Sequence, residues 1–179
     1  MRDNIELNKK LVAEMPYLAP HNAWTGEVAE DYDYSYIEGD YDLPAGWNKL
    51  FLQMCRDIKE PLGRAGIKDK FYFMQLKEKW NSLRAYHNGA TEEVERIIQK
   101  YSHLSQFVCS KCGKPATYET SGYILSYCTD CWSDMGRHKP GELITYDPIL
   151  TITRYTKEGK TTEMIDCGEE WRRLYDDVR

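Results

Sequence analysis

The sequence has no long apolar run, and nowhere does it approach the roughly 18 consecutive apolar residues that a membrane-spanning helix requires. Its first ten residues, MRDNIELNKK, also lack the apolar stretch of a secretory signal peptide. From these two absences we expect a cytoplasmic protein that makes no contact with a membrane.

Motifs of several enzyme classes are missing as well. The chain has no G-x-x-x-x-G-K-[ST] string to hold nucleotide phosphates and no H-x-E with P-C-x-x-C to build a zinc deaminase. The four histidines, at positions 21, 87, 103 and 138, stand alone and show no pairing with a nucleophile. We therefore expect a protein without enzymatic activity, although catalytic groups that meet only on folding escape such a search.

Positive charge is scarce relative to negative charge. The chain has 24 lysines and arginines against 29 aspartates and glutamates, which gives a formal net charge of −5. Sequence-independent affinity for nucleic acid comes mostly from basic side chains that displace counterions from phosphates. Nucleic acid is therefore a less favoured partner, and only a local basic patch would bind it.

The sequence does contain ample material for a folded core. Of its 179 residues, 41% are hydrophobic and 13% are aromatic, and 14 residues are tyrosines. This length and composition predict one main domain with room for one small additional module.

Four of the six cysteines are clustered in the sequence. Cys109-Ser-Lys-Cys112 and Cys128-Thr-Asp-Cys131 are two C-x-x-C pairs separated by 15 residues, a spacing typical of a zinc site built from two tight turns. We predict that these four cysteines bind Zn²⁺. Four protein ligands close the coordination sphere of zinc, so the metal would be structural rather than catalytic.

Two alternatives for the clustered cysteines are less favoured. Disulfides are typical of secreted domains, and the sequence has no signal peptide. A thioredoxin-type redox site needs a single C-x-x-C at the start of a helix after a buried strand, and neither pair has that setting. Cys55 and Cys167 stand alone, and we interpret each as a small buried apolar residue. With four thiolates and one Zn²⁺ the net charge would be about −7.

Hydrophobic periodicity and turn residues predict an α+β fold. Two main helices are expected, one from Trp47 to Pro61 and one from the N-cap Thr91 to residue 105. Between them we expect a central hairpin, with strands over 71–76 and 82–87 and a connecting loop over 77–81. The other expected elements are a short helix over 8–15, a zinc-ribbon hairpin turning near 121–122, strands over 142–146, 149–155 and 161–165, and a closing helix over 169–175. The last two strands would form a C-terminal β-hairpin.

These elements suggest three parts. Residues 1–106 would form an N-terminal α+β core, residues 107–134 the embedded zinc ribbon, and residues 135–179 a C-terminal hairpin and helix, all packed as one unit. Within the core, residues 30–42 form an arm rich in tyrosine and acid. Tyr32, Tyr34 and Tyr36 alternate with Asp31 and Asp33, so an extended arm would place rings and acids on opposite faces. The arm would either lay its rings on the core or form an acidic surface that mimics nucleic acid or docks on a basic host protein.

Basic, amide and aromatic side chains are concentrated around the central hairpin. Arginine supplies a planar fork for phosphate, lysine a point charge, and tryptophan or tyrosine a flat face for a base. The same residues would equally serve as ordinary turn charges and core rings. We predict that a small nucleotide-type ligand is bound by Trp47, Gln75, Lys77, Lys79, Trp80, Arg84 and Tyr86.

Six motifs follow one another along residues 8–132. They are Asn22-Ala-Trp-Thr-Gly26, Asp31-Tyr-Asp-Tyr-Ser-Tyr36, Leu43-Pro-Ala-Gly-Trp47, Gln75-Leu-Lys-Glu-Lys-Trp-Asn-Ser-Leu-Arg84, Ile97-Ile-Gln-Lys-Tyr101 and Cys109-Ser-Lys-Cys-Gly-Lys-Pro-Ala-Thr117. Together they resemble a family of small, uncharacterised zinc-ribbon proteins of bacteriophages and prophages. The resemblance implies a location in the bacterial host cytoplasm and no known reaction. Trp80-Asn81 departs from the aromatic residue and glycine usual there, and the chain after residue 132 has no counterpart.

Three functions are consistent with these features. The first is a non-enzymatic phage accessory protein that binds a small nucleotide-type ligand and thereby sequesters a host immune signal. The second is a protein-binding inhibitor of a host defence enzyme that acts through the acidic, tyrosine-rich surface. The third is a zinc-ribbon nucleic-acid adaptor or regulator, which the acidic charge disfavours. We favour the first.

Overall fold

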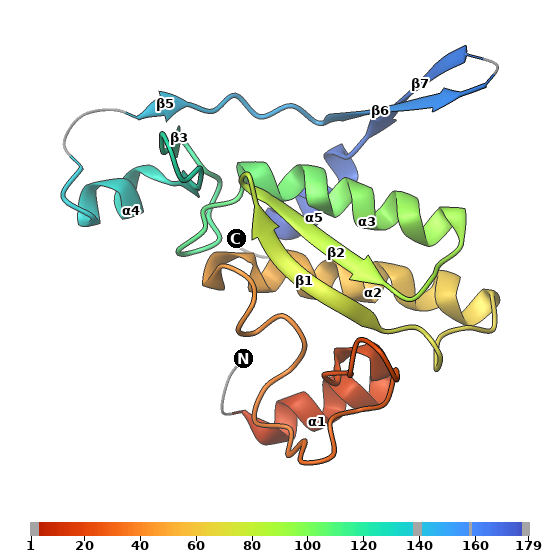
Figure 1. Cartoon of the computed structure of the whole chain (residues 1–179). Coiled ribbons are helices and arrows are strands. Elements are labelled where there is room, and N and C mark those ends of the chain that lie inside the picture. The colour runs from red at the N-terminus through yellow and green to blue at the C-terminus, as the bar shows by residue number, and fades with distance from the viewer. Residues whose placement is uncertain (1–3, 138–140, 158, 177–179) are drawn as a thin grey trace.

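The computed structural model describes residues 4–137, 141–157 and 159–176 (Figure 1). Its helices are α1 (Ile5–Glu14), α2 (Asn48–Arg64), α3 (Glu92–Leu104), α4 (Thr129–Asp134) and α5 (Gly168–Tyr175). Its strands are β1 (Phe73–Lys79), β2 (Ser82–His87), β3 (Tyr118–Glu119), β4 (Ser126–Tyr127), β5 (Glu142–Leu143), β6 (Ile149–Thr156) and β7 (Gly159–Asp166). The strands form two antiparallel hairpins, β1-β2 and β6-β7, and a small antiparallel sheet in the order β4-β3-β5. The predicted α+β fold is confirmed.

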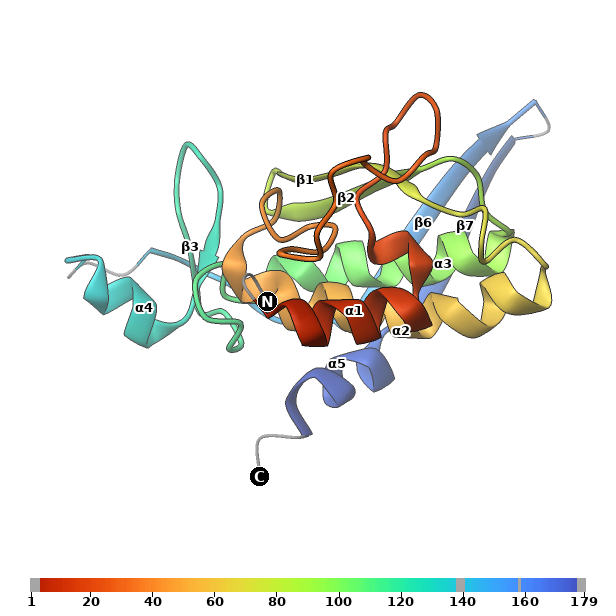
Figure 2. The same cartoon turned by 90° about the horizontal axis from the view of Figure 1, so that it is seen from below.

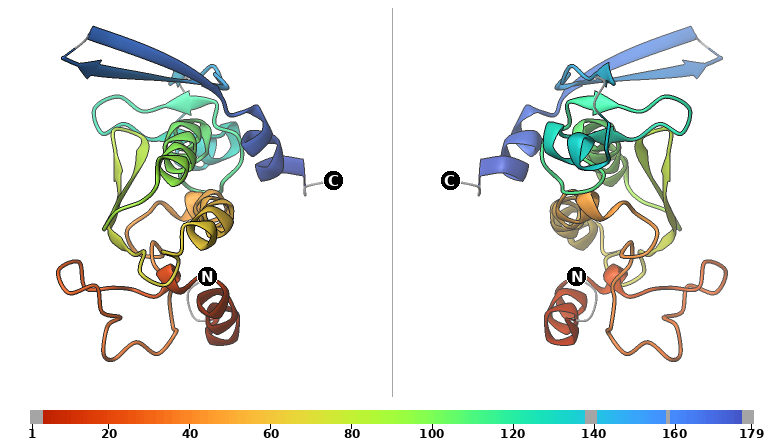
Figure 3. Two further views of the ribbon diagram at one scale, coloured as in Figure 1. Left: turned by 90° about the vertical axis from the view of Figure 1, so that its right-hand side faces the viewer. Right: turned by 90° about the vertical axis from the view of Figure 1, so that its left-hand side faces the viewer.

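Helices α2 and α3 lie side by side at the centre of the molecule. Figure 3 shows them nearly end on, with the β1-β2 hairpin covering one side of the pair and α5 lying on the other. Helix α1 and the loop after it form a layer on the side of α2 away from α3 (Figure 2). The largest fully buried side chains of this core include Trp47, Tyr17, Tyr101 and Phe73. Within the described part of the chain, no helix is both long and apolar enough to cross a membrane.

The two main helices begin and end close to the predicted residues. Helix α3 follows Thr91, whose Oγ1 accepts a hydrogen bond from the Val94 N–H at 3.4 Å and so caps the first turn. Helix α2 continues to Arg64, so the predicted end at Pro61 is wrong. Pro61 and the following Leu62 are both buried, and this packing holds the last turn although proline offers no N–H to it.

The central hairpin has a shorter turn than expected. Strand β2 has the predicted bounds, but the predicted connecting loop over 77–81 is wrong because β1 continues to Lys79. Only Trp80 and Asn81 connect the strands, and their φ angles are 55° and 57°. Two consecutive positive φ angles are characteristic of a type I′ turn, whose twist matches that of the paired strands.

The tyrosine- and acid-rich segment over 30–42 is folded into bends and turns, so the predicted extended arm is wrong. Tyr34 has a φ of 66°, which interrupts an extended chain, and its carbonyl accepts a hydrogen bond from Asn8 Nδ2 of α1 at 2.8 Å. The rings nevertheless gather. Centroid distances are 4.7 Å between Tyr32 and Tyr34, 5.7 Å between Tyr32 and Tyr36, and 5.1 Å between Tyr36 and Tyr41.

The C-terminal part runs over α3 and then returns to the core. The chain from β5 passes along α3 to the β6-β7 hairpin, whose distal end projects from the body (Figure 1). Strand β5 ends at Leu143, earlier than the predicted residue 146. Helix α5 docks through Arg173, whose two terminal nitrogens donate to both carboxylate oxygens of Asp57 at 2.9 and 2.7 Å. This two-point contact fixes α5 against α2.

Candidate functional site

The four clustered cysteines meet in the folded chain. One ligand atom from each lies within 4.8 Å of the others, and the Sγ atoms of Cys112 and Cys128 are 3.5 Å apart. Zinc–sulfur bonds of about 2.3 Å in a tetrahedron require sulfurs separated by about 3.8 Å. The donor set and its spacing therefore fit a metal ion with only small side-chain adjustments. Cys109, Cys128 and Cys131 are buried, whereas Cys112 is exposed.

Local backbone geometry prepares the cysteine cluster for anionic sulfur. Burial acts to raise the pKa of the Cys109 thiol, but backbone N–H groups of Cys128, Cys112 and Lys111 outweigh it and lower that pKa. Burial and hydrogen bonds to the neighbouring cysteines raise the pKa of Cys131 instead. The protein alone thus lowers the pKa of one of the thiols, and a bound cation would stabilise thiolates at this site.

The first cysteine pair is fastened to the core by an unusually close backbone contact. The Gly46 N–H donates to the Ser110 carbonyl at 3.0 Å, and a Cβ on Gly46 would lie only 2.0 Å from the Cys109 carbonyl oxygen. Only glycine allows that approach. On the other side, the Tyr175 hydroxyl of α5 donates to the Gly113 carbonyl at 3.2 Å.

A polar groove lies between the tip of the central hairpin, α3 and β6. It has a volume of about 410 Å³, within the usual range for small-molecule sites. We call it the Trp80 groove. Its lining is Trp80, Ser82 and Arg84 from the hairpin, Gln99, Ser102, His103 and Gln106 from α3 and the turn after it, and Leu150, Thr151, Ile152 and Thr153 from β6. One indole, one guanidinium, one imidazole and several amides and hydroxyls thus face a common space.

Two of the predicted ligand-binding residues dominate this groove. The Trp80 side chain is 65% exposed at the hairpin tip. Arg84 is exposed, and among the described residues no carboxylate forms an ion pair with it. An exposed indole next to an unpaired guanidinium offers a stacking face and an anion-binding fork.

Asn81, which follows Trp80 in the hairpin turn, is anchored by hydrogen bonds to neighbouring segments. The Asn81 side chain accepts from the Ser126 N–H at 3.1 Å and donates to the Gln106 carbonyl and a Glu119 carboxylate oxygen, each at 3.2 Å. It also hydrogen bonds the Ser126 hydroxyl. Because Ser126 lies two residues before Cys128, this network connects the groove to the ribbon that carries the cysteines.

The other predicted residues lie on the hairpin but outside the groove. Gln75 and Tyr86 pair across the strands and border a separate hollow of about 600 Å³. Lys77 donates to Gln75 Oε1 at 2.7 Å and lies 4.9 Å from the centre of the Tyr86 ring, so its charge is already engaged. Lys79 lines a small hollow on another side of Trp80.

The prediction that Trp47 binds the ligand is wrong. Its side chain is completely buried, and its indole N–H donates to the Val108 carbonyl at 3.2 Å, just before the first cysteine pair. The apolar periodicity that begins at Trp47 predicts a buried helix face, and the ring lies in that core. Conversely, no sequence pattern predicts the groove residues on α3 and β6, because only folding brings them beside the hairpin. His138, one of the four isolated histidines in the sequence, lies outside the described residues.

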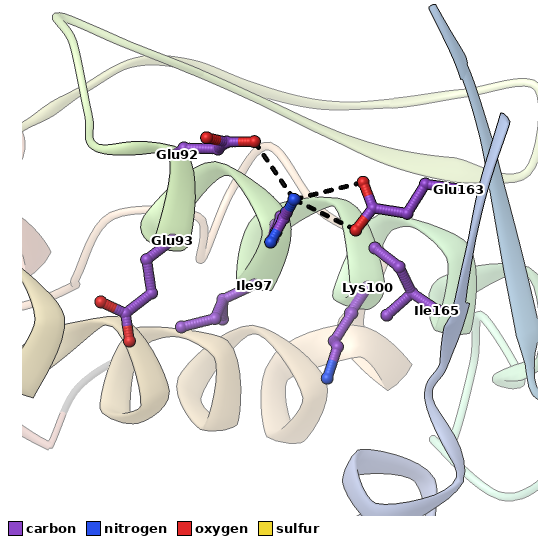
Figure 4. Close-up of a pocket in the computed structure, with 7 residues that line it drawn as sticks. Glu92, Glu93, Ile97, Lys100, Glu163 and Ile165 are labelled. Carbon is purple, nitrogen blue, oxygen red and sulfur yellow. Dashed lines mark hydrogen bonds and ion pairs between the residues drawn. The ribbon is translucent and has the colours of Figure 1, made fainter. Parts of the chain in front are cut away.

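A third hollow, between α3 and β7, is shown in Figure 4 and has a volume of about 530 Å³. Its positive charges are paired: Arg96 contacts Glu92 at 3.2 Å and Glu163 at 3.1 Å, and Lys100 contacts Glu170 at 2.7 Å. An anionic ligand would have to displace these carboxylates. The Trp80 groove imposes no such cost on its arginine, and we take it as the candidate ligand site.

The metal centre and the Trp80 groove are therefore the two candidate functional features of the molecule. The chain matches no family model, no curated protein and no solved structure.

Proposed function

We propose that this protein is a non-enzymatic binder of a small nucleotide-type ligand in the Trp80 groove, with Zn²⁺ at the four cysteines as a structural metal. The observation that carries the proposal is the meeting of an exposed indole and an unpaired guanidinium in one groove. Stacking on Trp80 suits a nucleobase, and the planar fork of Arg84 suits a phosphate.

The rest of the groove suits the polar edge of a nucleotide. Gln106 and Ser102 belong to the turn and helix that form its floor, and Thr151 and Thr153 come from the facing strand. Amides and hydroxyls of this kind can donate to and accept from base edges and ribose. The groove thus combines a flat apolar surface, one fixed positive charge and neutral hydrogen-bonding groups.

Zinc is the metal that best suits the cysteine cluster. Four thiolates in two C-x-x-C turns form a closed, soft site that favours Zn²⁺ and leaves no position for a substrate. The metal would therefore hold the two cysteine turns together. Metal analysis of the purified protein should give about one zinc per chain, and Cys112→Ser should lose it, while Cys167→Ala, away from the cluster, should retain it.

A biological setting is suggested by the resemblance to zinc-ribbon proteins of bacteriophages and prophages. In that setting the ligand would be a nucleotide signal of host immunity, which the protein would sequester in the bacterial cytoplasm. An accessory protein that only captures a ligand needs no catalytic groups, which agrees with the motifs that the sequence lacks.

Calorimetric titration with a panel of nucleotides tests the binding proposal. Trp80→Asn removes the indole and keeps a residue that tolerates positive φ, so the turn should survive. It should weaken binding about 5- to 150-fold, the equivalent of roughly 1–3 kcal/mol for one stacked base. Trp24→Ala removes another tryptophan, 92% exposed and outside the groove, and should leave binding unchanged. Absence of micromolar binding for the entire panel would refute the proposal.

A second candidate function is inhibition of a host enzyme through the tyrosine cluster over 30–42. Tyr41 is 60% exposed beside Asp42, and Trp24 is the most exposed large apolar side chain among the described residues. Aromatic rings surrounded by acids suit a basic protein surface.

The third candidate, a nucleic-acid adaptor, has less support because Lys111 and Lys114 of the ribbon are paired with Asp134 and Asp130.

A further inference from the structure

Trp80 borders two hollows rather than one. Besides the Trp80 groove, its indole lines a smaller hollow of about 240 Å³ formed with Glu78 and Lys79 of the hairpin and Gly122, Tyr123 and Ile124 of the ribbon. We call this second space the Tyr123 hollow. Because Trp80 lines both spaces, its aromatic side chain at the hairpin tip is available for stacking to a ligand that occupies either one.

Besides the shared Trp80, the Tyr123 hollow has an aromatic ring of its own, and each of the two spaces has its own cation. Tyr123 is 73% exposed, and its hydroxyl donates to Glu78 Oε2 at 2.7 Å, which holds the ring beside the tip. The other oxygen of Glu78 accepts from the Asn81 N–H at 2.7 Å, so this carboxylate is occupied. Lys79 forms no ion pair within the described residues, as is also true of Arg84 in the groove.

We propose that the ligand is a dinucleotide, with one base in the Trp80 groove and the other in the Tyr123 hollow. Trp80 lies between the two bases, and Arg84 and Lys79 supply positive charge for the phosphates that link them. This inference rests on the proposed function and specifies its ligand. A mononucleotide fills only one hollow, whereas two linked bases gain from the high effective concentration of the second after the first has bound.

The composition of the two hollows assigns them different tasks. The Trp80 groove is rich in amides and hydroxyls, so it can distinguish one base edge from another. The Tyr123 hollow offers Tyr123, Ile124 and the backbone at Gly122, and it accepts a base mainly through its faces. The first base is therefore selected by its hydrogen bonds and the second by its stacking.

Titration of the intact protein with matched ligands tests this inference. The ligands are adenosine and guanosine monophosphates, the corresponding linear dinucleotides and cyclic dinucleotides. We expect the best dinucleotide to bind at least about tenfold more tightly than the best mononucleotide. Equal affinities for mononucleotides and dinucleotides would overturn the inference and leave the proposed function standing. Binding of neither class would overturn both.

Variants of the Tyr123 hollow provide the second arm of the test. Tyr123→Ala and Lys79→Gln should each lower the affinity for the dinucleotide toward that of the mononucleotide and leave mononucleotide affinity unchanged. Tyr155→Ala removes a similarly exposed tyrosine from the projecting hairpin and serves as the control. If Tyr123→Ala left dinucleotide affinity intact, or if both ligand classes lost affinity equally, the second base would not lie in this hollow. A longer single strand that bound more tightly than any dinucleotide would also contradict the inference.

Discussion

Asn81 has a small side chain that joins three segments: the hairpin tip, the turn after α3 and the cysteine ribbon. Its oxygen and nitrogen are both engaged, with Ser126, Gln106 and Glu119 as partners. It also occupies a position with positive φ, which asparagine tolerates better than most residues. The same side chain therefore satisfies the turn geometry and holds the ribbon to the core.

The variant Asn81→Gly separates these two roles. Glycine keeps the positive φ but leaves the Ser126 N–H without its acceptor, and the Gln106 carbonyl keeps only its hydrogen bond from the Ser126 hydroxyl. We expect the free energy of unfolding to fall by about 2–3 kcal/mol, since buried groups lose their hydrogen bonds. Chemical denaturation measures this change. Trp80→Asn, at an exposed position of the same turn, should change it by less than about 1 kcal/mol, and equal losses in the two variants would contradict this role for Asn81.

Glu38 is a carboxyl group held in a poorly solvated position. Burial, together with the nearby Asp42 carboxylate, raises the pKa of Glu38 from its ordinary value of 4.5 to about 7. The folded state therefore holds a proton between these two pH values that the unfolded state has already released. The resulting stabilisation is complete below about pH 4.5 and is lost as the pH rises through about 7.

Replacing Glu38 with glutamine should remove the loss of stability that accompanies the rise in pH. Glu38→Gln should leave stability nearly unchanged at pH 4 and raise the free energy of unfolding at pH 8 by up to about 3 kcal/mol, the equivalent of the pKa shift. Thermal unfolding across this pH range provides the measurement. Glu30→Gln, an exposed position in the same segment, is the matched control. A variant curve parallel to that of the original protein would show that Glu38 does not titrate in this way.

At the scale of elements, the ribbon contributes residues to the proposed ligand site. Its loop supplies Gly122, Tyr123 and Ile124 to the Tyr123 hollow, and Ser126 supports the hairpin tip through Asn81. Tyr123 and Ser126 contact the central hairpin directly, and both ends of the loop continue into the cysteine turns at its base. The position of this loop should consequently depend on the bound metal.

Chelation should therefore weaken ligand binding although the metal lies outside the groove. Removal of the proposed zinc ion would leave four crowded thiols, and we expect faster amide hydrogen exchange over residues 117–127 and a lower melting temperature. Dinucleotide affinity should fall at least about tenfold, and mononucleotide affinity should fall less. Re-addition of zinc should restore both. Unchanged exchange over these residues after complete removal would contradict the proposed role.

The elements that the sequence predicted well are those set by local signals. Thr91 caps α3 through its own hydroxyl, and β2 has its predicted bounds. The tip of the central hairpin was missed because Trp80-Asn81 lacks the glycine that usually marks a type I′ turn. Proline at position 61 predicts the end of a helix, but burial of the last turn of α2 outweighs the hydrogen bond lost there.

The residues of the candidate sites also differ in how far local sequence signals predict them. The metal ligands were predictable because two C-x-x-C turns carry their geometry in short stretches of sequence. Trp80 and Arg84 were predicted by residue type alone. His103 and Thr151 of the groove were not, because contacts between α3 and a strand about 50 residues later leave no local pattern. Trp47 was misassigned because an amphipathic pattern does not distinguish a buried ring from a binding ring.

At the scale of the whole molecule, charge is unevenly divided. Eight of the 29 acidic residues lie between Leu11 and Asn48, where none of the 24 lysines and arginines lies, so 21 acids and 24 bases share the rest of the chain. This acidic stretch forms the layer around α1, and the β6-β7 side of the molecule lies at the opposite end (Figure 1). The site proposed for an anionic ligand is thus separated from the acidic layer.

This separation predicts a specific response to salt. At about 0.15 M salt the screening length is about 8 Å, so neutralising Glu30, Asp31 and Asp33 together should change nucleotide affinity by less than about twofold. At about 0.01 M salt, where screening extends to about 30 Å, the same variant should bind more tightly than the original protein. Titration at both salt concentrations measures the effect. Arg84→Gln should weaken binding under both conditions, because its contact with the phosphate is direct.

The contact between Gly46 and the Cys109 carbonyl has a consequence for how the molecule unfolds. The segment before α2 packs backbone to backbone against the first cysteine turn, with no side chain between them. Neither segment can therefore unfold without breaking this contact. Unfolding of the first cysteine turn would expose the N-terminal end of α2. Unfolding of α2 would in turn remove the segment against which this cysteine turn packs. Heating should therefore give a single calorimetric transition, in which the ribbon and the helical core melt as one cooperative unit.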